Sequence, residues 1–377
     1  MDDGSEDDSC SFVAQGTWQG VRLVRGQGLG ASRARNLGAE AAAGDILVFL
    51  DAHVIPDPGW LEELVPLLRE PTVGLAGLGV RNLEAPQAVG YTLFFKDEHL
   101  GMDWAGPLSP EPYESPCISG CCLAARRQVF REVGGFDPGT AKWGLEDMEL
   151  SLRAWFLGYR CLVSPLRCVS HFFKGHNRNF AVTFEDFDFN LLRVVYTYFP
   201  PELSAAVVAG IRHRENFPRS LARLHADRAF WERRAELHAR FRHNAAWYFS
   251  KFSVQFQAFQ ERIRELTKQN GAAMSKTYAP VVCPRCGGIN LGDLTHCLLC
   301  QADLPRVPES PHRPPPECPG CGAALRANAR FCGRCGMVIS APAPPEPASA
   351  PPPACPQCGR PLNPGARFCG GCGQQFG

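Results

Sequence analysis

The sequence has no long apolar run and no excess of charge of one sign. No stretch approaches the roughly 18 consecutive apolar residues that a membrane-spanning helix needs, and the N-terminus is acidic, unlike a secretory signal peptide. The 377 residues carry 39 basic and 38 acidic side chains, a net charge of +1. Such a balance creates no overall field that would attract nucleic acid or a membrane. We therefore expect a cytoplasmic protein without a transmembrane segment.

Cysteine is abundant and concentrated near the C-terminus. Twelve of the 18 cysteines form Cys-x-x-Cys pairs with ten residues between the two pairs of each module. In a reducing compartment this spacing indicates three zinc ribbons, each with four thiolates around one structural Zn²⁺. The predicted ligands are Cys283, Cys286, Cys297 and Cys300; Cys318, Cys321, Cys332 and Cys335; Cys355, Cys358, Cys369 and Cys372. The other six have no ligand spacing, and we expect buried free thiols: Cys10, Cys117, Cys121, Cys122, Cys161 and Cys168.

The length allows one domain of roughly 200 to 250 residues with appendages. Few glycines or prolines interrupt residues 201–277, which predicts helices there. The arginines of this segment suit a solvated helix face, and contact with an anionic acceptor or a membrane surface is the alternative. Its aromatic residues suit packing against the first domain or another chain. Stretches rich in Pro separate the cysteine modules as stiff spacers. The predicted order is a catalytic domain 1–200, a helical extension 201–277, ribbon 278–304, linker 305–316, ribbon 317–340, linker 341–353 and ribbon 354–377.

The first half of the chain is organised around an apolar run that ends in an acid. Ile46 to Leu50 predicts a strand buried on both faces, and Asp51 and His53 follow it. Ligands bind beyond the carboxyl ends of such strands. A carboxylate with an imidazole suits Mn²⁺ or a similar ion, which can bridge diphosphate oxygens.

Strand and helix patterns alternate around this run. Strands are predicted at 21–24, 46–50, 72–80 and 118–124, and helices at 32–43, from Pro58 onward, at 126–133 and after Trp143. Ser32 is a candidate helix cap, and Gly44 and Gly134 are candidate stops. The alternation favours an α/β fold with a mostly parallel sheet flanked by helices.

Three motifs carry a resemblance to a known family. They are Asp2-Asp3-Gly4-Ser5, the segment from Gly30 to Gly38, and the run that ends in Asp51. Together they resemble the donor-binding half of family 2 glycosyltransferases of the GT-A fold. The resemblance implies a nucleotide-sugar donor, with Asp2 or Asp3 near the base, Arg35 near the donor and Asp51 at a Mn²⁺ or Mg²⁺ site.

The metal motif points to a subfamily. Asp51-Ala52-His53 is similar to the Asp-x-His motif of the polypeptide N-acetylgalactosaminyltransferases, which implies His171 as a third metal ligand. Without that context, His171 would be read as a buried histidine with a backbone partner.

The segment Trp143-Gly144-Leu145-Glu146-Asp147 resembles the acceptor-side motif. Inverting members of the family place their catalytic base there, so the resemblance implies Asp147, or Glu146, as the base. The retaining N-acetylgalactosaminyltransferases have Asn at the place of Asp147, which leaves the stereochemistry open. The alternative is that both acids only stabilise the first turn of a helix.

One departure from the family concerns the first strand. Family members have a strand and a helix before the Asp-Asp-Gly-Ser turn, whereas here Met1 precedes it directly. A sheet without this strand would leave backbone groups unpaired. We expect a start upstream of Met1, or a truncated gene, rather than a working fold without it.

The combined prediction is a metal-dependent glycosyltransferase, hexosyl or N-acetylhexosaminyl, that uses a nucleotide sugar, most simply a UDP-sugar. Its acceptor would be a hydroxyl of a glycan, protein or lipid, and its ribbons would bind a protein partner. Nucleic acid is a poorer fit, since each ribbon has few basic residues. The rival prediction is an inactive glycosyltransferase-like scaffold that acts through its ribbons.

Overall fold

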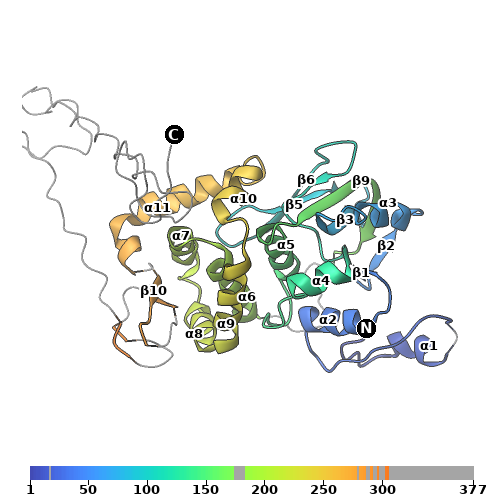
Figure 1. The fold of residues 1–377 in the computed structure, drawn as a ribbon, viewed down its shortest axis with the longest axis horizontal. Helices are drawn as coiled ribbons and strands as arrows, with labels where there is room; N and C mark the ends of the chain where they lie inside the picture. Colours follow the sequence, from blue (N-terminus) through green and yellow to red (C-terminus); the bar gives the residue numbers. More distant parts are fainter. Residues whose placement is uncertain are drawn as a thin grey trace, which may run out of the picture. The chain divides into compact units, whose positions relative to one another are not determined.

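The protein is represented by a computed structural model that describes residues 1–16, 18–173, 183–277, 280–285, 289–291, 295–296 and 302–304 (Figure 1). The chain divides into two compact units, Met1–Pro308 and Glu309–Gly377. All described elements belong to the first unit. Its strands are β1 (Ile46–Leu50), β2 (Val54–Pro56), β3 (Val73–Asn82), β4 (Val89–Gly90), β5 (Thr92–Phe95), β6 (Met102–Ala105), β7 (Tyr113–Glu114), β8 (Cys122–Arg126), β9 (Arg160–His171), β10 (Pro280–Val282) and β11 (Ile289–Leu291).

The helices follow the same order along the chain. They are the 3-10 helix η1 (Asp8–Cys10), then α1 (Ser11–Ala14), α2 (Ala31–Ala41), α3 (Trp60–Leu67), α4 (Arg127–Val133), α5 (Glu146–Phe156), α6 (Phe184–Tyr198), α7 (Pro201–Ile211), α8 (Phe217–Ala226), α9 (Arg228–Arg240), α10 (Ala245–Lys251) and α11 (Gln257–Thr277). No helix of the described residues is both long enough and apolar enough to cross a membrane.

The main sheet is mixed. Among the described strands its order is β1-β8-β3-β9-β2, with β4 added to β3 and β7 added to β9. Only β3 and β9 pair in parallel, and the remaining pairs are antiparallel. The α/β class with flanking helices is confirmed, but the expectation of a mostly parallel sheet is wrong. Alternating patterns show that helices separate strands, but they do not show which strand edges meet.

Side chains of the sheet strands alternate between two cores, as β1 and β3 show. Leu47 and Phe49 of β1 pack in the larger core with α4 and α5, whereas Ile46 and Val48 pack on the other side against the core around α3. β3 is buried from Val73 to Val80, which explains its continuous apolar sequence. The sheet therefore has an apolar core on each of its two faces.

Local predictions are confirmed where the backbone itself carries the signal. β1 and α4 have the predicted bounds to within one residue, and α4 ends at Gly134 with φ of 87°, a left-handed conformation that favours glycine. The strand predicted at 21–24 does not form; only a bridge between Asp2 and Arg25 is present there. Ser32 does not cap α2, because the helix begins one residue earlier after Gly30; the Ser32 side chain is buried and accepts a hydrogen bond from Thr140.

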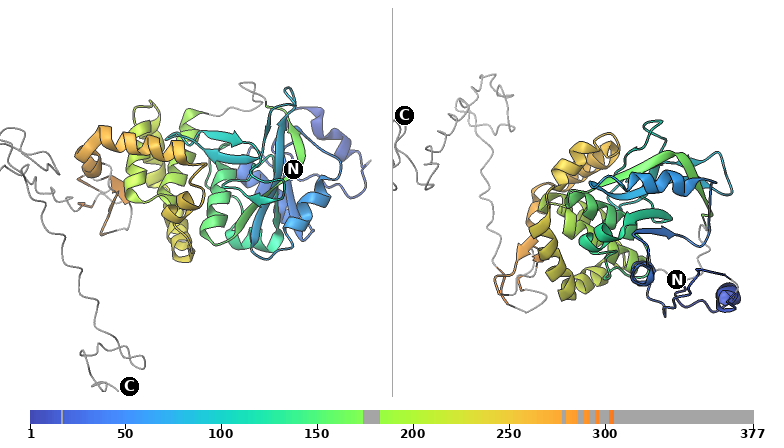
Figure 2. Two further views of the ribbon diagram at one scale, coloured as in Figure 1. Left: turned by 90° about the horizontal axis from the view of Figure 1, so that it is seen from above. Right: turned by 45° about the vertical axis from the view of Figure 1, so that its right-hand side comes forward.

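Helices α6–α11 gather at one end of the sheet, away from the N-terminal residues (Figures 1 and 2). They do not have a separate core. Phe95 of β5 contacts Phe256 and Phe259 at ring-centroid distances of 4.6 and 4.9 Å, and Trp155 of α5 contacts Phe252 at 5.2 Å. The helical extension predicted for residues 201–277 thus packs on the first domain through its aromatic residues.

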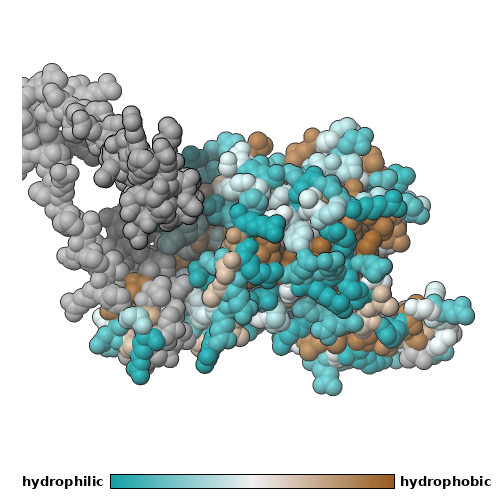
Figure 3. All heavy atoms as spheres, in the orientation of Figure 1, coloured by the Kyte–Doolittle hydropathy of each residue, from teal (hydrophilic) through white to brown (hydrophobic). Residues whose placement is uncertain are grey.

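The predicted free thiols lie mostly inside the molecule. Of the six, all but Cys10 are buried, and burial raises the pKa of the Cys121 and Cys122 thiols. Buried, protonated thiols of this kind behave as small apolar side chains. The molecular face in Figure 3 is mainly hydrophilic, with apolar areas scattered among polar ones.

Candidate functional site

Three candidate metal ligands meet at one end of the sheet. Asp51 follows β1, and His53 lies in the turn before β2. Pairing of β2 with β9 places Val54 opposite His171, so the last residue of β9 arrives beside the turn. The Asp51 Oδ2 atom is 3.5 Å from Nε2 of His171 and 3.9 Å from Nε2 of His53. Strand pairing therefore joins ligands that are far apart in the sequence.

The three side chains fit a divalent cation. One ligand atom from each lies within 4.8 Å of the others, a spacing that small side-chain movements would bring to the coordination distances of about 2.0–2.2 Å. Nδ1 of His171 is buried and has no hydrogen-bond partner among the described residues. The imidazole ring is therefore not held by hydrogen bonds at both of its nitrogens. Two imidazoles and one carboxylate leave coordination positions open for oxygens of another molecule.

Arg35 connects this group to the start of α5. Its guanidinium donates to Asp51 Oδ1 at 2.9 Å and to Glu146 Oε1 at 2.8 Å. Burial by itself would lower the pKa of Arg35, but these two carboxylates raise it above its ordinary value. Burial likewise opposes the ionisation of Asp51, yet a hydrogen bond with His171 and the charge of Arg35 lower the pKa of Asp51. Asp51 is thus held as a carboxylate, as a metal ligand must be.

The two acids at the start of α5 have different surroundings. Glu146 is buried, pairs with Arg35 and accepts the backbone N–H of Gly144 at 2.8 Å. Asp147 accepts the backbone N–H groups of Gly120 and Met148, both at 2.8 Å. Burial, together with the negative charge of Glu146, raises the pKa of Asp147 to about 6. Glu146 is therefore held by an ion pair, whereas Asp147 is a carboxyl group whose proton affinity is raised.

The turn before α5 has unusual backbone geometry. Lys142 and Leu145 have positive φ angles of 24° and 67° although neither is glycine. Conformations of this kind cost about 1–3 kcal/mol each and occur often at functional sites. The carbonyl of Lys142 accepts the first N–H of α2, which ties the turn to the helix that carries Arg35. Sequence reasoning had no signal for this strain, because it depends on a contact between distant segments.

One cavity of about 1160 Å³ contains most of these groups. Its lining includes Arg35, Asp51, His171, Glu146 and Asp147. Its remaining wall contains side chains that the sequence analysis did not select, among them Trp104 of β6, Phe187 of α6 and Arg214, Glu215 and Asn216 from the turn between α7 and α8. The helical extension therefore contributes to the wall of the site, which only the tertiary structure reveals.

Asp2 and Asp3 support the start of α2. Asp2 is buried, pairs with Arg25 at 3.1 Å and accepts the Ser5 N–H. Asp3 accepts the N–H groups of Leu29 and Gly30, each at 2.8 Å. Neither is among the described residues that line the cavity around Asp51. Their assignment to base binding remains a prediction.

Most predicted zinc ligands lie outside the described residues. Of the twelve, only Cys283 is described, and it is buried after β10. The other eleven are Cys286, Cys297, Cys300, Cys318, Cys321, Cys332, Cys335, Cys355, Cys358, Cys369 and Cys372. Their role as zinc ligands therefore rests on the sequence.

Two parts of the chain match known protein families. Residues 1–134 match the family described as glycosyl transferase family 2. The chain carries a family 2 glycosyltransferase domain. Residues 105–174 of this domain also match the family described as the N-terminal domain of galactosyltransferase. Residues 283–336 match the double zinc ribbon family, which covers the first two cysteine modules.

Two curated relatives of the glycosyltransferase domain are named after the polypeptide N-acetylgalactosaminyltransferases. The chain is 34% identical to an inactive polypeptide N-acetylgalactosaminyltransferase-like protein 5 of Macaca fascicularis over 192 residues, 47% of this chain and 43% of the relative. It is 33% identical to polypeptide N-acetylgalactosaminyltransferase 8 of Drosophila melanogaster over 175 residues, 42% of this chain and 28% of that protein. The chain thus spans less than half the length of these relatives.

A solved structure shows the same fold. The crystal structure of GalNAc-T7 with UDP, GalNAc and Mn²⁺ aligns with a TM-score of 0.50 and 22% identity, covering 65% of this chain and 48% of that one. The glycosyltransferase domain therefore has the GT-A fold.

Proposed function

We propose that the glycosyltransferase domain transfers a sugar from a UDP-sugar to an acceptor hydroxyl in a metal-dependent reaction. The observation that carries this proposal is the cluster of Asp51, His53 and His171, of which Asp51 and His171 line one cavity with Asp147. Relatives named as N-acetylgalactosaminyltransferases and a similar fold solved with UDP and Mn²⁺ support it. A hexosyl or N-acetylhexosaminyl group is the transferred sugar that fits this likeness.

In this proposal, one group of residues binds the metal ion and another accepts the proton of the acceptor hydroxyl. Asp51, His53 and His171 would hold Mn²⁺ or Mg²⁺, which offsets the negative charge that develops on a departing diphosphate. Arg35 orients Asp51 through its 2.9 Å contact and balances the charge of Glu146. Asp147 takes the proton of the attacking acceptor hydroxyl, because its raised pKa suits a general base, whereas Glu146 is engaged by Arg35.

The zinc-ribbon tail serves recruitment in this proposal. A ribbon whose four ligand positions are all cysteine has no open coordination position for catalysis. Few basic residues accompany the cysteines, so a protein surface is a better partner than nucleic acid. The tail would then bring the enzyme to its acceptor or to a larger assembly.

Nucleotide binding tests the donor site. UDP should raise the melting temperature of the full chain when Mn²⁺ is present and not in its absence, since the diphosphate binds through the ion. Asp51→Ala should abolish the increase, because one of three ligands is lost. Glu40→Ala, which removes an exposed carboxylate of α2, should keep it. A shift that is independent of metal and survives Asp51→Ala would favour the inactive scaffold, which is the rival function.

A further inference from the structure

A second cavity lies at the end of β1 opposite Asp51. It has a volume of about 700 Å³ and is formed where the start of β1, the end of α3 and the start of α4 meet. Ile46 lines this cavity, whereas Asp51 lines the other one. The five residue steps from Ile46 to Asp51 extend about 17 Å along a strand. The two cavities are therefore separate sites.

Four arginines surround this second cavity, which we call the arginine cavity. They are Arg69, Arg126, Arg127 and Arg131, and the acids in its lining are Asp45 and Glu132. Within the described part of the chain, none of the four arginines forms an ion pair with a carboxylate. By contrast, arginines elsewhere in the fold, such as Arg153 and Arg193, pair directly with acids. The arginine cavity thus has more positive charge than the acids in its lining neutralise.

The acids of the lining do not change this balance. Glu132 is engaged by Tyr159 and Gln128, whose hydrogen bonds lower the pKa of Glu132 most, and the charge of Arg126 adds a smaller effect. Asp45 is exposed to solvent. Four guanidinium groups against two carboxylates leave the arginine cavity with net positive charge.

Two of the arginines are held in place by the backbone. Arg127 donates from Nε to the carbonyl of Gly44 at 2.7 Å and from Nη1 to that of Ala39 at 3.2 Å. Arg126 donates from Nη2 to the carbonyls of Pro71 and Val73 at 2.6 and 3.1 Å. These contacts fix both side chains without neutralising them, so their charge is positioned in advance of any ligand.

The same two arginines keep unused donors. Nε of Arg126 and Nη2 of Arg127 are buried and have no hydrogen-bond partner among the described residues. Buried donors are normally satisfied, and each exception calls for a partner. An acceptor with several oxygens and more than one negative charge would supply partners to both. Phosphate has this chemistry, and guanidinium groups bind its oxygens with strong, charge-assisted hydrogen bonds.

We propose that the arginine cavity binds a phosphate group, either free phosphate or the phosphate of a small molecule. Arg126 and Arg127 form its fixed wall, and the exposed Arg69, after the end of α3, and Arg131 of α4 add charge. The site is independent of the proposed sugar-nucleotide site, since it shares no lining residue with it. Phosphate binding therefore does not require the metal ligands.

Titration of the full chain with inorganic phosphate, at constant ionic strength and without added divalent metal, tests the proposal by calorimetry. One saturable site is expected. The double variant Arg69→Gln, Arg131→Gln should bind at least about tenfold more weakly, since each charged hydrogen bond contributes about that factor. Both side chains are exposed, so the melting temperature of the variant in phosphate-free buffer should match the unmodified chain. Arg264→Gln, an exposed change on α11, is the matched control and should bind like the unmodified chain.

Further arms separate this site from the donor site. Asp51→Ala, and an excess of UDP with Mn²⁺, should leave phosphate binding unchanged. Titration with glucose 1-phosphate in place of inorganic phosphate distinguishes the two sources. Saturable binding of glucose 1-phosphate shows that the site accepts the phosphate group of a small molecule, and its absence shows that the site accepts only the free ion. Binding that does not saturate, binding that persists in the double variant, or binding lost in Asp51→Ala would each overturn the proposal.

Discussion

Three carboxylates around Arg35 differ in ways that their sequence does not show. Asp51 and Glu146 both accept hydrogen bonds from its guanidinium, and the pKa of Asp51 is lowered. Asp147 has only backbone N–H groups as close partners in the described site, and burial raises its pKa. Neighbouring acids with separated proton affinities are a common arrangement in acid–base catalysis. In the proposed reaction, Glu146 therefore positions Arg35 and Asp147 takes the proton.

Substitution of the two acids tests this division. Asp147→Asn should lower the rate of transfer by about 10²- to 10⁴-fold, the usual effect of removing a general base. Metal-dependent UDP binding should remain, because Asp147 is not among the proposed metal ligands. Transfer assays with Asp147→Asn and Glu146→Gln measure both effects.

The opposite pattern would change the mechanism. If Asp147→Asn stays active and Glu146→Gln is inactive, the reaction does not use Asp147 as a base. NMR of the product should then show retention of the donor's anomeric configuration. Full activity of both variants would contradict the assignment of this site.

The pH dependence follows from the raised pKa of Asp147. A carboxyl group with a pKa of about 6, rather than 3.8, is protonated at pH 5 and cannot accept a proton. We expect kcat/KM to rise about tenfold per pH unit below pH 6 and to level off above it. A rate profile measured from pH 4.5 to 8 checks this, with melting temperatures at each pH as the control for unfolding. A profile flat down to pH 4.5 would contradict it.

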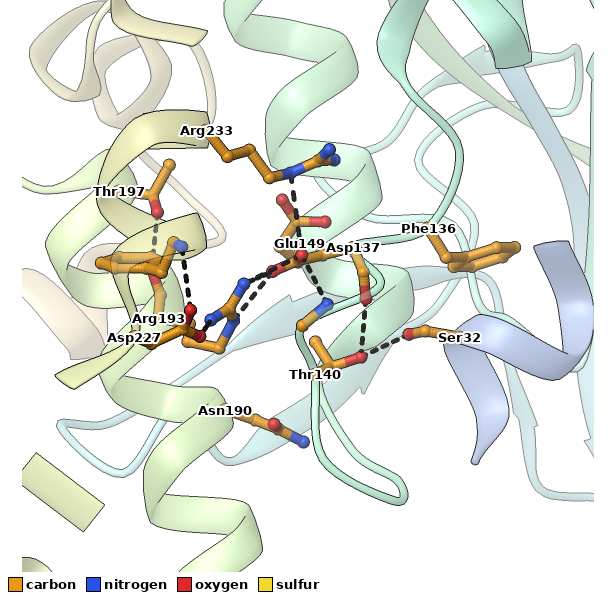
Figure 4. A network of polar contacts seen from close by, with 12 residues as sticks. Ser32, Phe136, Asp137, Thr140, Glu149, Asn190, Arg193, Thr197, Asp227 and Arg233 are labelled. Atoms are coloured by element: carbon orange, nitrogen blue, oxygen red, sulfur yellow. Dashed lines mark hydrogen bonds and ion pairs between the residues drawn. The ribbon is translucent and has the colours of Figure 1, made fainter. Parts of the chain in front are cut away.

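At the scale of elements, buried ion pairs connect the glycosyltransferase domain to the helical extension. Arg193 of α6 contacts Asp137 through three hydrogen bonds of 2.7–3.0 Å and Asp227, which caps α9, at 2.6 Å (Figure 4). Arg233 of α9 lies 3.6 Å from the same Asp137. Burial by itself would raise the pKa of Asp137, but the charges of Arg193 and Arg233 lower it. These contacts hold α6 and α9 against the segment that leads to Asp147.

Arg193→Met should destabilise the fold by about 3–5 kcal/mol, because it keeps the side-chain volume but leaves buried Asp137 without its main partner. The loss should diminish as the pH falls through the ordinary carboxyl range, where protonation removes the uncompensated charge. Urea unfolding at pH 7.5 and pH 4 measures both effects. Arg228→Met removes an exposed pair with Glu232 and should change stability by less than about 1 kcal/mol. Equal effects of the two substitutions would show that the network does not stabilise the fold.

At the scale of the whole molecule, the chain combines parts stabilised in different ways. The unit Met1–Pro308 has a large apolar core that continues from β1 to α11. The cysteine modules are too short to bury comparable apolar surface, so their folding should depend on metal. A structural Zn²⁺ contributes about 10–16 kcal/mol to such modules.

Purified full-length protein should contain three Zn²⁺, one for each group of four cysteines. Chelation should unfold the tail and leave the main unfolding transition of the glycosyltransferase domain in place. Elemental analysis and calorimetry before and after chelation measure both. The Asp51→Ala variant should contain the same amount of zinc as the unmodified protein, which would show that the zinc is bound by the tail and not at the proposed donor site. One zinc or none would rule out the threefold ribbon.

The sequence by itself determined the features that local chemistry controls. The apolar run of β1, the end of α4 at Gly134, the helical residues after 201 and the cysteine spacing follow from backbone preference, burial and ligand geometry within short segments. The family motifs also identified Asp51, His53 and His171 as one group, although His171 is remote from the other two in the chain.

Only the tertiary structure decided how the distant parts combine. Strand order and direction depend on which edges meet, so the single parallel pair of β3 and β9 among the described strands could not be read from alternating patterns. The link from Asp51 through Arg35 to Glu146, the strained turn at Leu145 and the wall contributed by Arg214 all join segments that are remote in sequence. Such contacts form because folding buries apolar faces together, and the polar groups carried along with those faces then become partners.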